Sequence, residues 1–452
     1  MLINEIEFEG RVIKLHDDNV AALKNTFTII VGKNGSGKSR FLRKLTQSCV
    51  QALVGSKETT GLMDGAKLPG NVIAVSTSPF DRFPMPEYSS IMLMDERHVI
   101  DAKGYYFYQG LRGLYGVNLS VAFMVQIIGA VIKALMVNEE RVRTILDVLD
   151  YLGFERLMSV SLACDFTRPT LERLATKVGF DEYATGARRP SNEVKRLMAR
   201  LGNESPDCVE KVIEAIGYYN AVCGDKKIDI LITENGIDTL RGIIDERFVM
   251  LMECGVLKFK LLSLRKQGVQ KPVRISDASS GEQCVVMTML GIAARIKHGS
   301  LICIDEPEIC LHPEWQERYI QLLMSTFQGF QSCQFVVATH SPQIVSRLGN
   351  ENCYVLDLKS NSLQRAEVFN NRSVDFQLAQ VFNAPGFKNE YLMRELLGIV
   401  GALSSGKELS RSQQDFMGGA KALKSSFSSN DPVLQLVKLV EDALKVQEAQ
   451  GE

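Results

Sequence analysis

The stretch Gly32-Lys-Asn-Gly-Ser-Gly-Lys-Ser39 decides the fold, because it fits G-x-x-x-x-G-K-S between a predicted strand and a predicted helix. The strand is the apolar run Thr26 to Val31, and apolar residues recur at helical spacing after Ser39. Glycines at 32, 35 and 37 allow the positive φ angles that aim backbone N–H groups into one concavity. The pattern predicts a loop that cradles phosphate groups, and its strand–helix context makes a chance glycine turn a poor alternative.

Within this loop we expect each residue from Gly32 to Arg40 to contact a nucleotide. Lys38 would place a full positive charge on the β- and γ-phosphates, and Ser39 would offer its hydroxyl to Mg²⁺. The expected set is Gly32, Lys33, Asn34, Gly35, Ser36, Gly37, Lys38, Ser39 and Arg40.

Two other apolar runs end in residues that suit phosphate chemistry. Leu301 to Ile304 is followed by Asp305, expected to hold Mg²⁺, and by Glu306, expected to orient or deprotonate the attacking water. The run from Phe335 is followed by His340, which could sense the γ-phosphate. Alone, an Asp-Glu strand end is often a solvated one and a single histidine is often structural; the glycine loop favours the catalytic interpretation of both.

The segment Asp277-Ala-Ser-Ser-Gly-Glu-Gln283 precedes a predicted helix and forms a second anion-binding helix end. We expect Ser280, Gly281 and Gln283 to contact nucleotide, although Ser280 and Gln283 also have the spacing of an N-terminal capping box. One nucleotide does not need two such helix ends from one chain. Two chains arranged head-to-tail would use both.

Composition limits the classes of function. Among 452 residues, 52 basic and 53 acidic side chains nearly cancel, so the whole chain has no electrostatic pull toward nucleic acid or membrane. The ten cysteines form no C-x-x-C pair, which argues against zinc and for a reducing compartment.

The most apolar stretch, 119–137, contains Lys133 and is predicted to be a buried helix. With no signal peptide evident, we expect a soluble cytoplasmic protein without membrane contact.

The patterns predict an α/β protein in four parts. Residues 1–110 would form an N-terminal lobe with an antiparallel β subdomain and the glycine loop, and 111–227 a helical insertion. Residues 228–370 would complete the parallel core sheet, including a helix near 237–252, a hairpin of 256–264 with 273–276, and a helix over 281–298. Residues 371–452 would be a helical region for partner binding or oligomerisation, its last helix starting at Asp431-Pro432.

These motifs, in this order, resemble those of the ABC ATPases, which implies binding and hydrolysis of ATP with Mg²⁺. Gly32 to Ser39 matches their Walker A loop, Ser279 to Gln283 their signature loop, Leu301 to Glu306 Walker B, and His340 the H-switch. The resemblance implies that Ser280 and Gly281 contact ATP bound by another protomer. Ser279 and Glu282 depart from the transporter signature, whereas Asp305-Glu-Pro-Glu-Ile-Cys-Leu-His-Pro313 has the form of the OLD/RecF/SMC-like branch. No residue matches the Q-loop convincingly; Gln109 is a candidate.

Two further segments, Val72 to Pro84 and Ser373 to Phe387, are similar to the PtuA ATPases of Septu and related retron anti-phage systems. This resemblance implies a homo-oligomer and a PtuB-like HNH nuclease partner, with nucleic acid bound through the complex. OLD nucleases carry their nuclease domain after the ATPase. Here the 112 residues after His340 contain no D-x-D cluster, so we expect a separate effector.

Other hypotheses stay open. A RecF/SMC-like DNA-repair ATPase would bind DNA directly, through basic clusters such as 188–189, 195–200 and 258–266. A transporter subunit is disfavoured by the insertion and the altered signature. An ATP sensor with little turnover would keep the same site residues.

Overall fold

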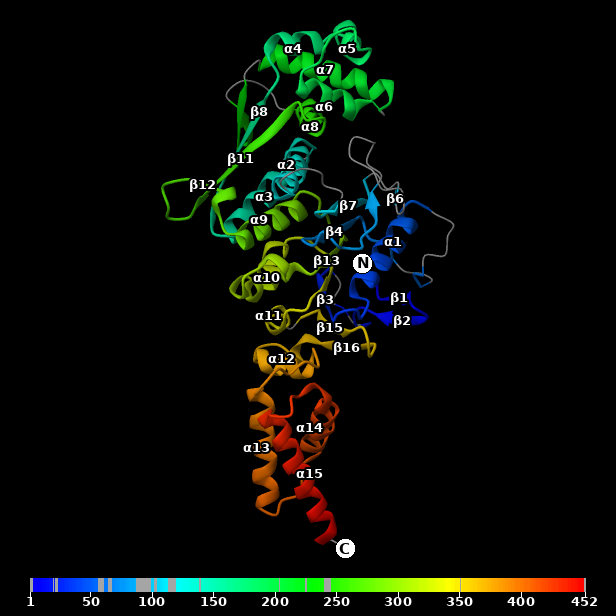
Figure 1. The fold of residues 1–452 in the computed structure, drawn as a ribbon, viewed down its shortest axis with the longest axis vertical. Coiled ribbons are helices and arrows are strands. Elements are labelled where there is room, and N and C mark those ends of the chain that lie inside the picture. Colours follow the sequence, from blue (N-terminus) through cyan, green and yellow to red (C-terminus); the bar gives the residue numbers. More distant parts are fainter. Residues whose placement is uncertain are drawn as a thin grey trace.

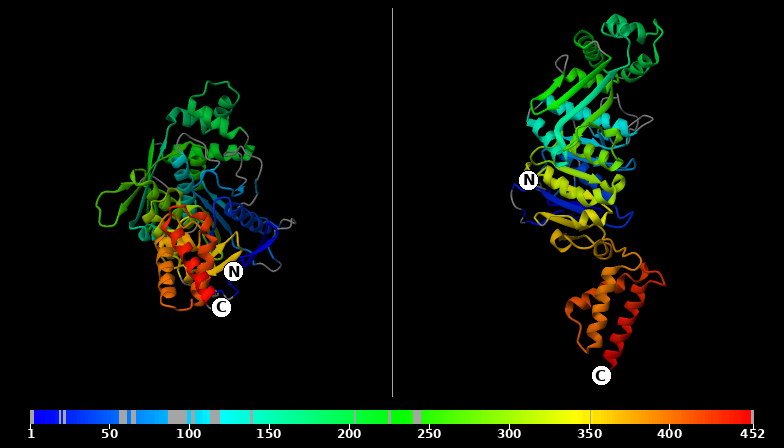
Figure 2. Two further views of the ribbon diagram at one scale, coloured as in Figure 1. Left: turned by 60° about the horizontal axis from the view of Figure 1, so that its bottom comes forward. Right: turned by 90° about the vertical axis from the view of Figure 1, so that its left-hand side faces the viewer.

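The computed structural model describes residues 3–18, 20, 23–55, 61–63, 67–86, 99–100, 104–112, 119–137, 140–202, 204–223, 226–239, 245–349 and 351–450. Along its longest axis the molecule has three parts: an antiparallel sheet with helices at one end, a parallel sheet in the middle, and a helical C-terminal region at the other end (Figure 1; Figure 2). The phosphate loop belongs to the middle part.

The central sheet has seven strands in the order β16-β15-β3-β14-β13-β4-β7, and only β16 runs antiparallel to its neighbour. Its strands are β3 (Thr26–Val31), β4 (Val72–Ser76), β7 (Tyr106–Gln109), β13 (Leu301–Asp305), β14 (Gln334–Ala338), β15 (Cys353–Asp357) and β16 (Ser362–Arg365). Since β3, β13, β14 and β4 are parallel neighbours, their carboxyl ends meet along one edge. The predicted α/β fold with a parallel core sheet is confirmed.

Alternating side chains of this sheet enter two different cores, because successive residues of a strand point to opposite faces. Ile30 and Cys303 pack with α1 (Lys38–Leu53) and with the hairpin of β1 (Glu5–Phe8) and β2 (Arg11–Lys14). Ile29 and Ile302 face the opposite core, which is built largely from helices. Those helices include α2 (Leu119–Val137), α3 (Glu140–Tyr151), α9 (Ser280–Ala293), α10 (Pro313–Thr326) and α11 (Pro342–Ser346). Both faces of the sheet are therefore covered.

The insertion combines helices with a five-stranded antiparallel sheet of order β10-β9-β8-β11-β12. Its strands are β8 (Phe154–Cys164), β9 (Lys227–Thr233), β10 (Gly236–Thr239), β11 (Leu257–Lys266) and β12 (Val273–Arg274). Between β8 and β9 lie α4 (Arg168–Leu174), α5 (Lys177–Ala184), α6 (Asn192–Leu201) and α7 (Pro206–Val222), and α8 (Glu246–Glu253) precedes β11.

This region corrects two sequence predictions. The expected helices within 111–227 are present, but β8 was missed, and it is the central strand that pairs with both β9 and β11. The boundary predicted at 227 therefore cuts a continuous sheet. The helix expected over 237–252 is wrong at its start, where β10 lies and α8 begins only at Glu246, but its end agrees with the end of α8 at Glu253. Residues 240–244 lie outside the described residues. The predicted hairpin is confirmed as β11 with β12.

The C-terminal region has its own small core of helix residues such as Leu396 and Val437. It contains α12 (Val374–Gln380), α13 (Glu390–Ser404), α14 (Arg411–Ala422) and α15 (Pro432–Gln450). The predicted start of the last helix is confirmed, since Asp431 Oδ1 accepts a hydrogen bond from the Val433 N–H at 2.9 Å. Short pieces complete the chain: β5 (Met85–Pro86), β6 (Val99–Ile100), and the 3₁₀ turns Ile275–Asp277, Pro307–Cys310, Ala366–Val368 and Lys424–Ser426. In the described part of the chain, none of the helices is long and apolar enough to span a bilayer.

Candidate nucleotide site

The glycine loop joins β3 to α1 in the conformation that its sequence predicts. Gly32, Gly35 and Gly37 have φ angles of 151°, 79° and 95°, all in the region that L side chains avoid. A Cβ on Gly32 would lie 2.7 Å from Ser36 Oγ, so this position also lacks space for a side chain. Helix α1 has no side-chain cap at Gly37, which leaves its first N–H groups for a ligand.

Lys38 lies at the centre of the loop and is almost fully buried. Its Nζ donates to the Gly32 carbonyl oxygen at 3.0 Å and to His340 Nε2 at 2.6 Å. Burial lowers the pKa of the Lys38 ammonium, while the nearby Glu306, Glu308 and Asp305 carboxylates act in the opposite direction. The amine is held where an incoming phosphate would meet it.

Ser39 and Asp305 meet across the gap between α1 and β13, with Ser39 Oγ donating to Asp305 Oδ1 at 3.2 Å. Burial, with further contributions from Glu306, Asp81 and Glu308, raises the pKa of Asp305 to about 7. A carboxylate crowded by other acids beside a hydroxyl is a set of hard oxygen donors, and Mg²⁺ prefers such donors. The residues present therefore fit a magnesium ion.

Glu306 follows Asp305 in the left-handed conformation, with φ 48° and ψ 57°. A strand would point adjacent side chains to opposite faces, and the left-handed turn removes that constraint. Its carboxylate Oε1 lies 3.6 Å from His340 Nε2, and its backbone N–H donates to the Ala338 carbonyl at 2.9 Å. The turn therefore lets Glu306 face His340 while Asp305 faces Ser39.

His340 follows β14 and is fixed through its backbone by Glu308. The His340 N–H and the Thr339 hydroxyl both donate to the Glu308 carboxylate, the latter at 2.8 Å. Burial, and secondarily the charge of Lys38, lowers the pKa of His340 to about 4, so the imidazole is neutral at pH 7. Glu308 was not predicted as a site residue, and the structure shows it orienting His340.

A cavity of about 560 Å³ lies beside these residues, and Asp305 and Glu308 do not line it. It is lined by Asn34, Gly35, Ser36, Gly37, Lys38, Ser39, Arg40, Arg82, Glu306 and His340. The buried Ser36 hydroxyl has no hydrogen-bond partner among the described residues, and a bound phosphate would supply one. Of the expected set, Gly32 and Lys33 do not line the cavity, and Lys33 is exposed. Arg82 was not expected at all.

The signature loop lies apart from this cavity. Ser279 and Ser280 are exposed at the start of α9, and Ser280, Gly281 and Gln283 are absent from the cavity lining. Gly281 has no positive φ; a Cβ there would lie 3.3 Å from the Cys310 carbonyl oxygen, so close packing accounts for the glycine. Gln283 Nε2 donates back to the Ala278 carbonyl at 2.9 Å. Within one chain, the two loops do not meet at a nucleotide.

Gln109 does not lie where a Q-loop glutamine is expected. The Gln109 side chain is buried against α9, so close to Gly291 that a Cβ on that glycine would lie 2.7 Å from Gln109 Oε1. Gln109 does not line the cavity. The strand beside β13 is β4, and the segment after β4 reaches the cavity through Arg82.

Of the basic clusters considered for DNA binding, the one at 258–266 is ion-paired. Lys258 and Lys260 lie 2.5 and 3.6 Å from Asp165, and Arg265 lies 3.2 Å from Glu155. Lys266 pairs with Glu282 at 2.8 Å. These pairs neutralise much of the positive charge of this one cluster, which direct binding to a phosphate backbone would need.

Comparison with known proteins connects this geometry to ATPases. Residues 185–346 match the family described as "AAA domain, putative AbiEii toxin, Type IV TA system", which is less than half of the chain. The "Retron Ec83 probable ATPase" of Escherichia coli is 32% identical over 93 residues, covering 18% of this chain and 17% of that protein. The "Retron Vc95 probable ATPase" of Vibrio cholerae serotype O1 biovar El Tor is 27% identical over 96 residues, covering 19% and 18%. The chain thus matches less than a fifth of the length of these relatives.

Among solved structures, similar chains include a nucleotide-free ATP-binding cassette from an ABC transporter, 12% identical, covering 81% of this chain and 90% of that chain, with a TM-score of 0.25. An SMC head bound to the C-winged helix domain of ScpA is 14% identical, covering 80% and 96%, with a TM-score of 0.26. At these scores the superpositions carry no argument, so the fold assignment rests on strand order and loop geometry.

Proposed function

We propose that this chain binds ATP with Mg²⁺ and hydrolyses the γ-phosphate bond. One observation carries the proposal: the glycine loop with Ser39, Glu306 and His340 line a single cavity, and Asp305 contacts Ser39 beside it. Three separate sequence segments contribute these residues, and each brings the residue type that phosphoryl transfer to water needs. The matches to proteins named as probable ATPases support the same activity.

Each residue has a role that follows from its position. The N–H groups of the loop and α1 bind the phosphates, and Lys38 neutralises their charge. Ser39 and Asp305 would hold the magnesium ion, which when bound withdraws charge from the phosphate oxygens. Glu306 positions the attacking water and accepts its proton, and His340, neutral at rest, donates to the γ-phosphate or that water.

Glu306→Gln provides the test of hydrolysis. The amide keeps the size of the side chain but loses the basic carboxylate, so we expect turnover to fall about 10²- to 10⁴-fold with ATP affinity preserved. Phosphate release and binding of a labelled nucleotide measure the two quantities on the full chain. If Glu306→Gln hydrolyses ATP at the wild-type rate, the carboxylate has no part in the chemistry.

We further propose that two chains close head-to-tail, each adding Ser280 and Gly281 to the ATP of the other. The exposed Ser280 at the tip of α9, away from the cavity of its own chain, supports this arrangement. In the same proposal, Glu306→Gln accumulates as an ATP-bound dimer. Size-exclusion chromatography with and without ATP distinguishes this from a monomeric enzyme.

The biological role that we propose is control of a separate HNH-type nuclease in anti-phage defence. The names of the matched retron ATPases support it. The similarity of 72–84 and 373–387 to PtuA also favours it. The test is co-expression with a neighbouring HNH gene, followed by co-purification and phage challenge. Absence of a complex, together with unchanged resistance in Lys38→Ala, would reject this role while leaving the ATPase proposal intact.

A further inference from the structure

The segment after β4, residues 77–84, starts beside the catalytic carboxylates. Strand β4 pairs in parallel with β13, and Ser76 lies opposite Asp305 in the register. The next residue, Thr77, donates its hydroxyl to the Glu306 carbonyl oxygen at 3.4 Å. The segment therefore leaves the sheet on the side of the cavity where Asp305 and Glu306 lie.

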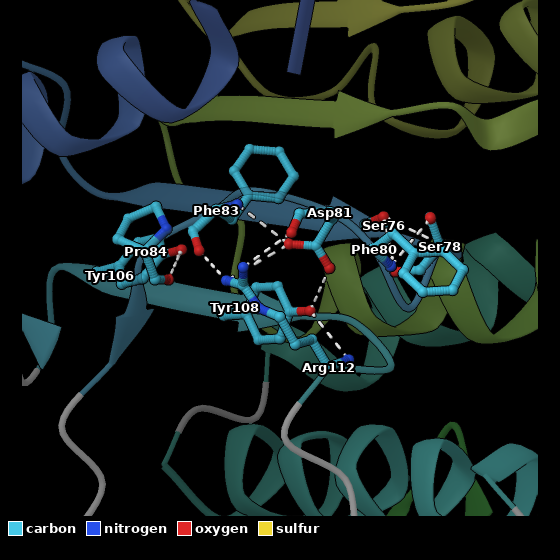
Figure 3. A network of polar contacts seen from close by, with 9 residues as sticks. All are labelled: Ser76, Ser78, Phe80, Asp81, Phe83, Pro84, Tyr106, Tyr108 and Arg112. Carbon is cyan, nitrogen blue, oxygen red and sulfur yellow. Dashed lines mark hydrogen bonds and ion pairs between the residues drawn. The ribbon is translucent and has the colours of Figure 1, made fainter. Parts of the chain in front are cut away.

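Buried Asp81 holds this segment in one conformation (Figure 3). Its side chain is fully buried, and its carboxylate accepts from the Phe83 N–H at 3.1 Å and from the Tyr108 hydroxyl at 2.5 Å. Arg112 completes the set at 3.5 Å from Asp81 Oδ1. Burial raises the pKa of Asp81, whereas Arg112 and the Tyr108 hydrogen bond stabilise its charged form. A carboxylate this buried is costly unless such partners satisfy it.

Arg112 also fixes the backbone on both sides of residue 82. Its guanidinium donates to the Asp81 carbonyl at 2.8 Å and to the Phe83 carbonyl, as Figure 3 shows. The Tyr106 hydroxyl continues the restraint with a 2.6 Å hydrogen bond to the Pro84 carbonyl. The residue between the two held carbonyls is Arg82, so its Cα has little freedom to move.

Arg82 differs from the other cations of the cavity. Lys38 donates hydrogen bonds to the Gly32 carbonyl and to His340, and Arg40 forms an ion pair with Glu9 at 3.0 Å. Arg82 lines the same cavity, is exposed, and makes no ion pair or hydrogen bond with any residue that the structure describes. A guanidinium that has no partner among the described residues and is carried on a rigid backbone is suited to bind a phosphate group.

We infer that Arg82 binds the terminal phosphate of the triphosphate held by its own glycine loop, and that Asp81, Tyr108 and Arg112 are positioning residues for it. The inference rests on the proposed function, since it concerns the same cavity. The place of β4 next to β13 puts Arg82 on the γ-phosphate side, so it distinguishes ATP from ADP. Arg82 thus takes the role for which Gln109 was only a candidate.

The experiment compares the affinities of ATP and ADP in the full-length chain by calorimetry. Arg82→Ala is expected to weaken ATP binding at least about tenfold, with ADP binding changed less than about threefold, because a hydrogen bond to a charged group is lost only with ATP. Arg82→Lys should recover part of the loss, since it retains the charge but not the fork. Phe80→Ala, at an 87% exposed neighbour on the same segment, is the matched control and should leave both affinities unchanged.

A double-mutant cycle tests the positioning residues. Tyr108→Phe removes the hydrogen bond to Asp81 and should weaken ATP binding severalfold in the presence of Arg82, and not in Arg82→Ala. Additive losses would mean that Tyr108 only stabilises the fold, and thermal denaturation without nucleotide measures that contribution separately.

Lys38→Ala separates this inference from the proposed function. Wild-type ATP affinity in Arg82→Ala, with nucleotide binding lost in Lys38→Ala, would overturn the role of Arg82 and leave the ATP site standing. Equal loss of ATP and ADP in Arg82→Ala would also overturn the assignment to the terminal phosphate. Unchanged binding in both Arg82→Ala and Lys38→Ala would reject the site as a whole.

Discussion

The phosphate loop and the signature loop are both glycine-containing helix starts, yet they are built in opposite ways. In the phosphate loop, three glycines have positive φ and α1 has no side-chain cap, so its N–H groups remain for a ligand. In the signature loop, Gly281 has ordinary backbone angles, and Ser279 caps α9 by accepting a hydrogen bond from the Glu282 N–H at 3.2 Å.

This difference indicates that only one of the two loops is a complete binding site within a single chain. The phosphate loop lines a cavity shared with Glu306 and His340, whereas the signature loop caps itself and presents Ser280 to solvent. The signature loop can contact a phosphate only when a second molecule presents its bound nucleotide to Ser280. The comparison therefore favours the head-to-tail arrangement and gives it testable consequences.

The largest expected effect is in the phosphate loop. Lys38→Ala removes a buried ammonium held at 3.0 Å from the Gly32 carbonyl, and we expect ATP affinity to fall about 100-fold or more, as charge-assisted contacts to phosphate are lost. Titration with a fluorescent ATP analogue measures it. Lys44→Ala, which removes the same charge further along α1, is the control and should bind normally. Equal affinity in wild type and Lys38→Ala would contradict the site.

A smaller effect is expected in the signature loop, and on a different quantity. Ser280→Ala should bind ATP with wild-type affinity in dilute solution, because Ser280 does not line the cavity of its own chain. Its hydrolysis rate per chain should fall about 10- to 100-fold, since one hydrogen bond to a charged phosphate is lost across the dimer. Phosphate release measured over a range of protein concentrations checks this. If Ser280→Ala weakened ATP binding by the monomer, the signature loop would belong to the nucleotide site of its own chain, and the proposed distinction between the two loops would be wrong.

The residues of the phosphate site were predictable because each follows a short, buried parallel strand. The glycine loop, Asp305, Glu306 and His340 are local patterns, and parallel strands bring their carboxyl ends together without further information. Arg82 and Glu308 were not predicted as site residues, because their roles depend on long-range contacts: Asp81 with Arg112, and Glu308 with the His340 backbone. The sequence Phe80-Asp-Arg-Phe83 contains an Asp-Arg pair, which alone is a weak indication of a functional site. Only the pairing of β4 with β13 shows that this segment lies beside the nucleotide cavity.

The fold of the insertion was harder to predict for a similar reason. Strand β8 has alternating buried residues at Met158, Val160 and Leu162, which is the period of a half-buried strand. Because predicted helices precede and follow this segment in the sequence, the whole of 111–227 was predicted to be helical. Its partners β9 and β11 are distant in the chain, so the pairing that stabilises it could not be read locally.

The glycines of the two loops should differ in their effect on stability. Gly32→Ala places a Cβ 2.7 Å from Ser36 Oγ at a φ of 151°, which should cost about 1–3 kcal/mol of unfolding free energy. Gly281→Ala should cost less than about 1 kcal/mol, because the tight 3.3 Å contact with the Cys310 carbonyl is offset by the better helix propensity of alanine. Chemical denaturation of both variants provides the comparison, and equal losses would contradict it.

The smallest effect separates two adjacent serines. Ser279→Ala removes the cap of α9 and should lower the unfolding free energy by about 1 kcal/mol, and Ser279→Asp, another good N-cap residue, should restore it. Ser280→Ala should leave stability unchanged, since its side chain makes no hydrogen bond with the residues that the structure describes. Denaturation and ATP hydrolysis measured on both variants should thus give opposite patterns: a stability loss at 279 and an activity loss at 280. If the same serine controls both quantities, the signature loop is a structural helix start and no part of a partner's nucleotide site.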